Sequence, residues 1–196
     1  MSDTTAGAGT AGTGAVRIEA AGVRDAGEIL TVQRAAYTTE AQLYGDPFIP
    51  PLVESPDQVR AALRETGGLV LKAVLDGRLA GAVRARFNGR TCLVGRLVVA
   101  PDLQGRGIGR RLLRAVEDAA AGRADACVLF TGHLSDGNLR LYRRAGYRET
   151  HRERVAAHLT HVHMRKTLEP PAAAPADPMA PAEPAGTAEP AEPAGA

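Results

Sequence analysis

The chain has 196 residues, of which 44% are hydrophobic, and it carries a formal net charge of +2, two cysteines and no tryptophan. No apolar run approaches the ~20 residues of a membrane span, and the N-terminus lacks the charged start and apolar stretch of a signal peptide. Cys92 and Cys127 lack CxxC spacing and lie in apolar runs, which is typical of core residues rather than of a disulfide framework. We expect a cytoplasmic protein without a membrane partner.

The two ends of the chain differ from its middle. Residues 1–14 are mostly Gly, Ala and Thr, and residues 169–196 hold 8 of the 13 prolines. Such segments bury too little apolar surface to fold, so we expect disorder at both ends and one domain at 15–168. Leaving out the five acids of the tail and Asp3 raises the formal charge from +2 to +8. This basic middle suits a phosphate-rich ligand, but it lacks the basic and aromatic surface pattern of a nucleic-acid partner.

The first third of the domain predicts one strand and two helices. A strand at 16–20 precedes a helix at 23–37, in which apolar residues recur at helical spacing. The periodicity is lost between 38 and 51. Ser55 and Pro56 then begin a second helix, with Ser at the N-cap and Pro at the first helical position.

Three strands follow, at 69–75, 79–87 and 92–99. The dipeptides Asp-Gly and Asn-Gly that separate them favour tight hairpin turns, so the three strands should form an antiparallel meander.

The last part of the domain alternates helices and strands. A helix at 107–121 and a strand at 126–131 predict a parallel crossover. A short helix at 137–145 and strands at 148–155 and 160–168 follow. The expected fold is therefore a single α/β (α+β) domain with a mixed, mostly antiparallel sheet, a β-α-β crossover and helices on both faces.

A glycine-rich loop joins the third meander strand to the helix at 107–121. In QGRGIG, residues 104–109, the glycines let successive N–H groups point at one anion, and the positive end of the helix dipole points at the same place. Arg106, Arg110 and Arg111 add positive charge. A P-loop would require Gly-Lys-Ser/Thr here, and a dinucleotide-binding fold would require GxGxxG. The loop therefore predicts a phosphate site of another kind.

Two motifs and the order of elements resemble the GNAT superfamily of acyl-CoA-dependent N-acyltransferases. Residues 104–109 match its [RQ]xxGx[GA] signature, and NLRLYRRAGY, residues 138–147, is similar to its second signature. The resemblance covers residues 16–168. It implies an N-acetyltransferase with acetyl-CoA as cosubstrate, and a possible homodimer.

The resemblance also implies a cofactor site. The pyrophosphate would lie on the N–H groups of the glycine loop, the pantetheine arm would pair with the edge of the 92–99 strand, and a backbone N–H near Val98 would polarise the thioester carbonyl. The residues expected to contact acetyl-CoA are Leu97, Val98, Val99, Gln104, Gly105, Arg106, Gly107, Ile108, Gly109, Arg110 and Asn138.

Catalysis requires an acid for the departing thiolate and a base for the amine. By resemblance Tyr142 is the acid, since a phenol with a pKa of about 10 is protonated at neutral pH. Relatives often carry a carboxylate in the strand before the loop, where this chain has Val-Gly-Arg at 94–96. Glu40 and His133 are the candidate bases, with Asp46 or a water relay as alternatives.

The segment 36–52 should form the acceptor pocket. Its expected substrate-binding residues are Tyr37, Glu40, Tyr44, Asp46 and Phe48. The carboxylates would attract an amine cation, which favours a small-molecule amine. A protein or peptide acceptor and a non-catalytic CoA-binding module are the alternatives. His161 and His163 share one strand face, but no third ligand is near in sequence, so we expect no metal.

Overall fold

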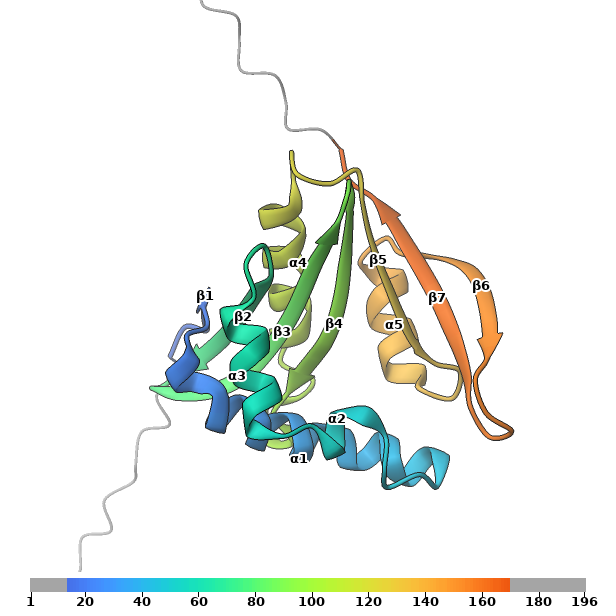
Figure 1. Ribbon diagram of the computed structural model, residues 1–196, viewed down its shortest axis with the longest axis horizontal. Coiled ribbons are helices and arrows are strands. Elements are labelled where there is room, and N and C mark those ends of the chain that lie inside the picture. Colours follow the sequence, from blue (N-terminus) through green and yellow to red (C-terminus); the bar gives the residue numbers. More distant parts are fainter. Residues whose placement is uncertain (1–13, 170–196) are drawn as a thin grey trace, which may run out of the picture.

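The computed structural model describes residues 14–169, so the segments expected to be disordered lie outside the described residues except at Gly14 and Glu169 (Figure 1). The strands are β1 (Arg17–Ala20), β2 (Leu69–Leu75), β3 (Arg78–Asn88), β4 (Thr91–Val99), β5 (Ala126–Gly132), β6 (Arg148–Arg154) and β7 (Thr160–Thr167). The helices are α1 (Ala26–Tyr44), α2 (Pro50–Val53), α3 (Pro56–Arg64), α4 (Ile108–Ala120) and α5 (Asp136–Arg144), with short 3-10 turns η1 (Val23–Asp25) and η2 (Pro101–Leu103).

The strands form one sheet in the order β1-β2-β3-β4-β5-β7-β6. Neighbouring strands are antiparallel except β4 and β5, which run parallel and are joined by the α4 crossover. The predicted hairpin turn between β2 and β3 is present: Asp76 and Gly77 both have positive φ, 50° and 77°, as the favoured two-residue hairpin turns require. These observations confirm the mixed, mostly antiparallel sheet and its meander.

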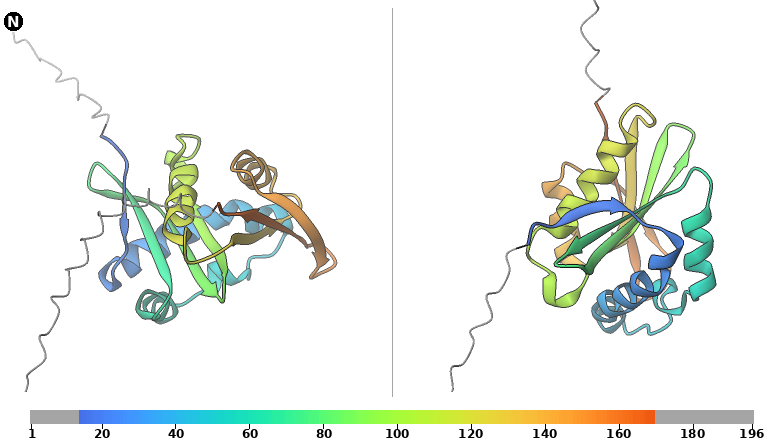
Figure 2. Two further views of the ribbon diagram at one scale, coloured as in Figure 1. Left: turned by 90° about the horizontal axis from the view of Figure 1, so that it is seen from above. Right: turned by 90° about the vertical axis from the view of Figure 1, so that its left-hand side faces the viewer.

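Helices cover both faces of this sheet, as predicted (Figure 2). On one face α4 buries an apolar stripe that includes Leu112 and Val116, and α5 adds Leu139. On the other face Ile29 of α1 and Val59 of α3 pack together in a second core cluster. Fully burying one such side chain stabilises the fold by about 1.5–3 kcal/mol. Among the described residues, no helix has the length and apolar character needed to span a membrane.

Helix α1 is longer than predicted. We expected its end at Tyr37, and this is wrong: the helix continues to Tyr44 because Ala41 and Tyr44 extend its buried side. It ends at Gly45, whose φ of 62° lets its N–H reach the carbonyls of the last turn. The added turns carry Glu40 and Tyr44 beneath the end of β5. The short helix α2 is also absent from the sequence prediction.

Strands β4 and β5 pair only where they begin. Three residue pairs join them, from Thr91↔Ala126 to Leu93↔Val128, and beyond these the strands diverge (Figure 1). The register of β4 against β3 shifts next to Arg96, which has a φ of 51°. An extra residue in one strand bends it and increases its twist. This irregularity, which no feature of the sequence predicted, accompanies the opening in the sheet.

Candidate active site

Two hollows meet at the opening between β4 and β5. One, which we call the cleft, has a volume of about 540 Å³ and lies between residues 94–97 of β4 and 130–132 of β5. The other, which we call the groove, has a volume of about 820 Å³ and runs past the glycine loop between α4 and α5. Leu97, Gln104 and Asn138 line both hollows. A ligand bound along the groove can therefore reach into the cleft.

The glycine loop forms one wall of the groove. Gly105 and Gly107 have φ of 77° and 78°, and a Cβ on either would meet nothing within 4 Å, so glycine is required here for the backbone conformation rather than for space. The first helical bond of α4 runs from the Arg111 N–H to the Gly107 carbonyl, 3.1 Å. The N–H groups of the preceding turn have no intrahelical partner and point to where an anion would bind.

The groove is strongly basic. Its lining includes Arg106 from the loop, Arg110 from the first turn of α4, and Arg140 and Arg144 from α5, and it includes no acidic residue. Arg111 does not belong to it, because its guanidinium donates to the Val16 carbonyl at 3.2 Å, so our prediction that it reinforces the loop is wrong. Sequence reasoning missed the two arginines of α5. Their i, i+4 spacing, which places them on one helix face, was the available signal.

The free edge of β4 is defined by alternating backbone groups. The Ala100 N–H donates to the Ala80 carbonyl of the β3 side, 2.9 Å, whereas the Val99 carbonyl accepts from the Gln104 side chain on the open side, 3.2 Å. Because backbone groups alternate along a strand, Val98 faces β3. Val98 lines neither hollow. Leu97 and Val99 are therefore the edge residues, and we correct the expectation that Val98 offers its N–H to the opening.

Tyr142 lies on α5 at the wall of the cleft and is 7% exposed. Burial raises the pKa of Tyr142 well above its usual value, and Tyr37 and Glu40 raise it further. Burial also raises the pKa of Tyr37 to about 12. Both phenols therefore remain protonated at neutral pH and can donate a proton or a hydrogen bond.

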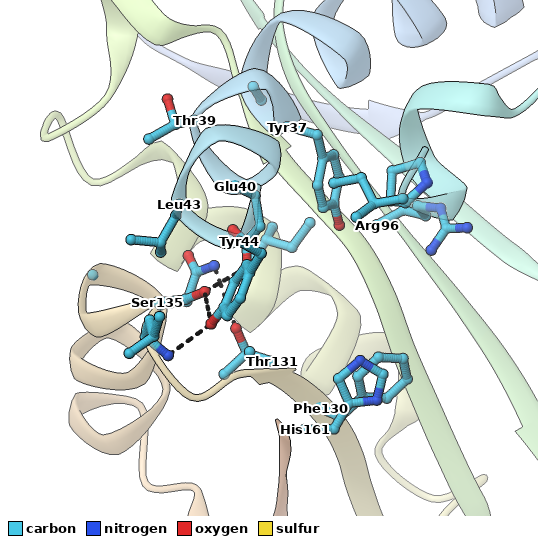
Figure 3. Close-up of a pocket in the computed structure, with 18 of the residues that line it drawn as sticks. Tyr37, Thr39, Glu40, Leu43, Tyr44, Arg96, Phe130, Thr131, Ser135 and His161 are labelled. Atoms are coloured by element: carbon cyan, nitrogen blue, oxygen red, sulfur yellow. Dashed lines mark hydrogen bonds between the residues drawn. The ribbon is translucent and has the colours of Figure 1, made fainter. Parts of the chain in front are cut away.

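Glu40 and Tyr44 form a hydrogen-bonded group on the floor of the cleft (Figure 3). Ser135 donates to the Glu40 carboxylate, and its hydroxyl lies 3.3 Å from that of Tyr44. The Leu134 N–H donates to the Tyr44 hydroxyl at 2.6 Å. A Cβ on Gly132 would be 2.3 Å from this hydroxyl, so the approach of Tyr44 to β5 requires glycine there. Helix α1 is thereby joined to β5 and α5.

The other predicted acceptor-side residues lie elsewhere. Neither His133, Asp46 nor Phe48 lines the cleft. The His133 ring accepts from the Thr160 N–H at 3.2 Å, and Asp46 accepts from the Phe48 N–H at 2.8 Å. Phe48 is 76% exposed. Of the two candidate bases, the structure brings only Glu40 to the cleft.

Arg96 lies in the cleft wall, in the part of β4 where the family resemblance would place a carboxylate. Behind it, Glu54 accepts from Arg84 at 2.7 Å and from Gln33 at 2.7 Å. Burial by itself would raise the pKa of Glu54, but these bonds and the charges of Arg84 and Arg96 outweigh it and lower that pKa. This network ties α1 and the segment after α2 to β3 and β4, and it was not predicted.

The chain is similar in sequence to a known protein family and to two curated proteins. The family model described as "Acetyltransferase (GNAT) domain" matches residues 35–168. UPF0157 protein YqkA of Bacillus subtilis is 31% identical over 66% of this chain and 36% of its own length. A mycothiol acetyltransferase of Clavibacter sepedonicus is 37% identical over 47% of this chain and 31% of its own length. The matched part thus spans about a third of these curated relatives.

A solved structure shares the fold. The ribosomal-protein-S18-alanine N-acetyltransferase of Escherichia coli superposes with a TM-score of 0.66 over 79% of this chain and 94% of its own, at 16% sequence identity. At this identity the likeness concerns the fold alone. This chain and the E. coli enzyme therefore share their overall fold.

Proposed function

The chain belongs to the GNAT acetyltransferase family, and from this premise we propose that it transfers an acetyl group from acetyl-CoA directly to a primary amine of a small molecule. The observation that carries the proposal is the meeting of the groove and the cleft at Leu97, with Tyr142 on the cleft wall. Donor and acceptor could bind from opposite sides of the sheet and meet in the opening.

We place the CoA part of the donor in the groove. Its pyrophosphate would accept from the N–H groups of residues 105–110, and the four groove arginines would balance its phosphate charges. Its pantetheine arm would pair with Val99, replacing the Gln104 side chain on that carbonyl. The thioester would then lie near Leu97, where a backbone N–H can stabilise the oxyanion.

The transfer needs no covalent enzyme intermediate. The neutral amine attacks the carbonyl carbon, a C–N bond forms, the C–S bond breaks, and the acetylated amine and CoA thiol remain. Tyr142 would donate its proton to the departing sulfur, since burial keeps the phenol protonated. Glu40 would take the proton of the amine, directly or through water, because it is the candidate base that reaches the cleft.

The cleft suits a small amine. Its volume of about 540 Å³ is typical of small-molecule sites. The carboxylates of Glu40 and Asp136 in its lining attract a cationic amine. One of the relatives, the enzyme of C. sepedonicus, is a mycothiol acetyltransferase.

A protein or peptide acceptor is the second candidate. Leu43, Phe130 and Leu134 line the cleft and are 45%, 53% and 46% exposed. Exposed apolar residues gathered at one rim favour contact with a larger partner. The structural neighbour from E. coli acetylates an alanine of ribosomal protein S18.

Thiol release from acetyl-CoA over a panel of small amines and short peptides tests the proposal. We expect release with at least one small amine and weaker release with peptides; a preference for peptides would favour the second candidate. CoA binding without thiol release from any acceptor would indicate a non-catalytic module instead.

Tyr142→Phe tests the assigned acid. Loss of a general acid typically costs about 10²–10⁴-fold in rate, so kcat should fall by at least about 100-fold while the affinity for CoA, measured by calorimetry, stays unchanged. Because burial raises the pKa of Tyr142, the wild-type kcat should not decline on the alkaline side until above pH of about 10. An unchanged kcat in the variant would remove Tyr142 from the mechanism.

A further inference from the structure

Three imidazoles and a carboxylate gather on one face of the β6–β7 hairpin. His161 and His163 are two residues apart on β7, and their direct cross-strand partners on β6 are Glu153 and His151. Residues directly opposite each other in an antiparallel pair project to the same side of the sheet. The pairing therefore supplies the third ligand that was missing near the two histidines in sequence.

The polar atoms of three of these residues are already close together. The candidate ligand atoms of Glu153, His161 and His163 all lie within 4.8 Å of one another, and His163 Nε2 is 3.0 Å from a Glu153 carboxylate oxygen. Ligand atoms on one tetrahedral zinc ion are roughly 3.4 Å apart, given bonds of about 2.0–2.1 Å. Small side-chain rotations would bring the three groups onto one ion.

The surrounding rings hold the two histidines in place. His161 stacks on Phe130 of β5 at 4.4 Å between ring centroids, and His163 stacks on His151 at 4.2 Å with an interplanar angle of 9°. The alternating residues of β7, Val162 and Met164, are buried in the core. Their burial holds His161 and His163 on the opposite face of the strand. An ordered pair of imidazoles loses less conformational freedom on binding than two mobile side chains would.

We propose that Glu153, His161 and His163 form a binding site for one divalent transition-metal ion of the zinc class. Imidazole nitrogen and carboxylate oxygen together suit zinc, and three protein ligands leave one tetrahedral position for water or another small ligand. Metal binding at His163 Nε2 would replace its hydrogen bond to the Glu153 carboxylate. Because His161 and Phe130 also line the cleft, the ion lies at its outer rim.

Calorimetric titration of the full, untagged chain with zinc chloride tests the site, with cobalt(II) as a spectroscopic probe. We expect saturable binding of one ion per chain. Outer partners of metal ligands already contribute about 10–100-fold in affinity, so His163→Ala should weaken binding by at least about tenfold. Glu153→Gln changes an exposed side chain and serves as a second variant should His163→Ala fold poorly. It should also weaken binding.

His158→Ala is the matched control. This histidine lies between β6 and β7, is half exposed, and its Nε2 is 3.9 Å from an Asp46 carboxylate oxygen. It should bind zinc as the wild type does. The proposal is overturned if the wild type shows no saturable binding, or if His158→Ala reduces the affinity as much as His163→Ala. The zinc titration is independent of the acetyl-transfer assay, and none of the three substituted residues lines the cleft or the groove.

Discussion

The groove and the cleft are built in different ways. The groove takes most of its lining from one continuous stretch, residues 103–110, and its chemistry consists of backbone N–H groups and arginines. The cleft is assembled from α1, α2, β4, β5, α5 and the start of β7, and its chemistry consists of side chains held by one another. A site made by backbone conformation is therefore local in sequence, whereas a site made by side chains depends on the packing of remote elements.

Gly107→Glu should have the largest effect, because it tests whether the groove depends on backbone conformation. The variant places a side chain at a φ of 78° and a negative charge where the pyrophosphate would lie. We expect complete loss of CoA binding by calorimetry. Gly122→Glu, at a φ of 79° outside both hollows, is the control and should bind CoA normally. Equal losses in both would mean that the groove is not specifically affected.

Glu54→Gln tests whether the cleft depends on its buried network. Arg84 and Glu54 are 14% and 12% exposed, and loss of the carboxylate leaves Arg84 without its charge partner. Breaking a buried pair costs roughly 3 kcal/mol, which urea unfolding at pH 7 would measure. The exposed pair Glu65–Arg86 offers the control Glu65→Gln, expected to cost less than about 1 kcal/mol.

The same variant has a defined pH dependence. The folded-state pKa of Glu54 lies below its usual value, so the stability it contributes is present above the unfolded pKa of about 4.3 and is lost as pH falls through the folded value. The difference in unfolding free energy between the wild type and Glu54→Gln should therefore shrink in acid. A difference that stays constant down to pH of about 2 would contradict the assigned ionisation.

Gly132→Ala tests the contact that joins α1 to β5. The added methyl group would lie 2.3 Å from the Tyr44 hydroxyl, which must move. Overpacking of this kind costs about 1–3 kcal/mol, and we expect acetyl transfer to fall while CoA binding is retained. Gly137→Ala, where a Cβ meets nothing within 4 Å, should leave the unfolding free energy nearly unchanged. Retained activity in Gly132→Ala would show that the position of Tyr44 is not critical.

Arg140→Ala should have the smallest effect. Arg140 lines the groove as one of four arginines, and a single solvent-exposed charge pair contributes about 1 kcal/mol or less. We expect a decrease of about fivefold in CoA affinity, diminishing as salt is added. Arg111→Ala, which removes the bond to the Val16 carbonyl instead, should leave that affinity unchanged.

Most of the fold could be predicted because its signals are local. Asp76-Gly77 and the Ser55-Pro56 cap specify their turns within a few residues, and the structure confirms both the hairpin and Ser55 as the N-cap of α3. The last turns of α1 were missed because the two threonines after Tyr37 interrupt the apolar pattern, and only burial against remote elements shows that Ala41 and Tyr44 continue it.

Signals between residues close in the chain were sufficient to predict the family, which the family model confirms, and the glycine loop between β4 and α4. Glycines with positive φ and a helix N-terminus offer backbone N–H groups from one short segment. Consecutive residues are therefore sufficient to predict that such a segment can bind an anion. Three outcomes required the three-dimensional structure. Glu40 rather than His133 lines the cleft, Arg111 does not line the groove, and Glu153 lies opposite His161 on the neighbouring strand. Those outcomes depend on strand register and on the packing of α1 beneath the opened sheet, which bring together residues far apart in the chain.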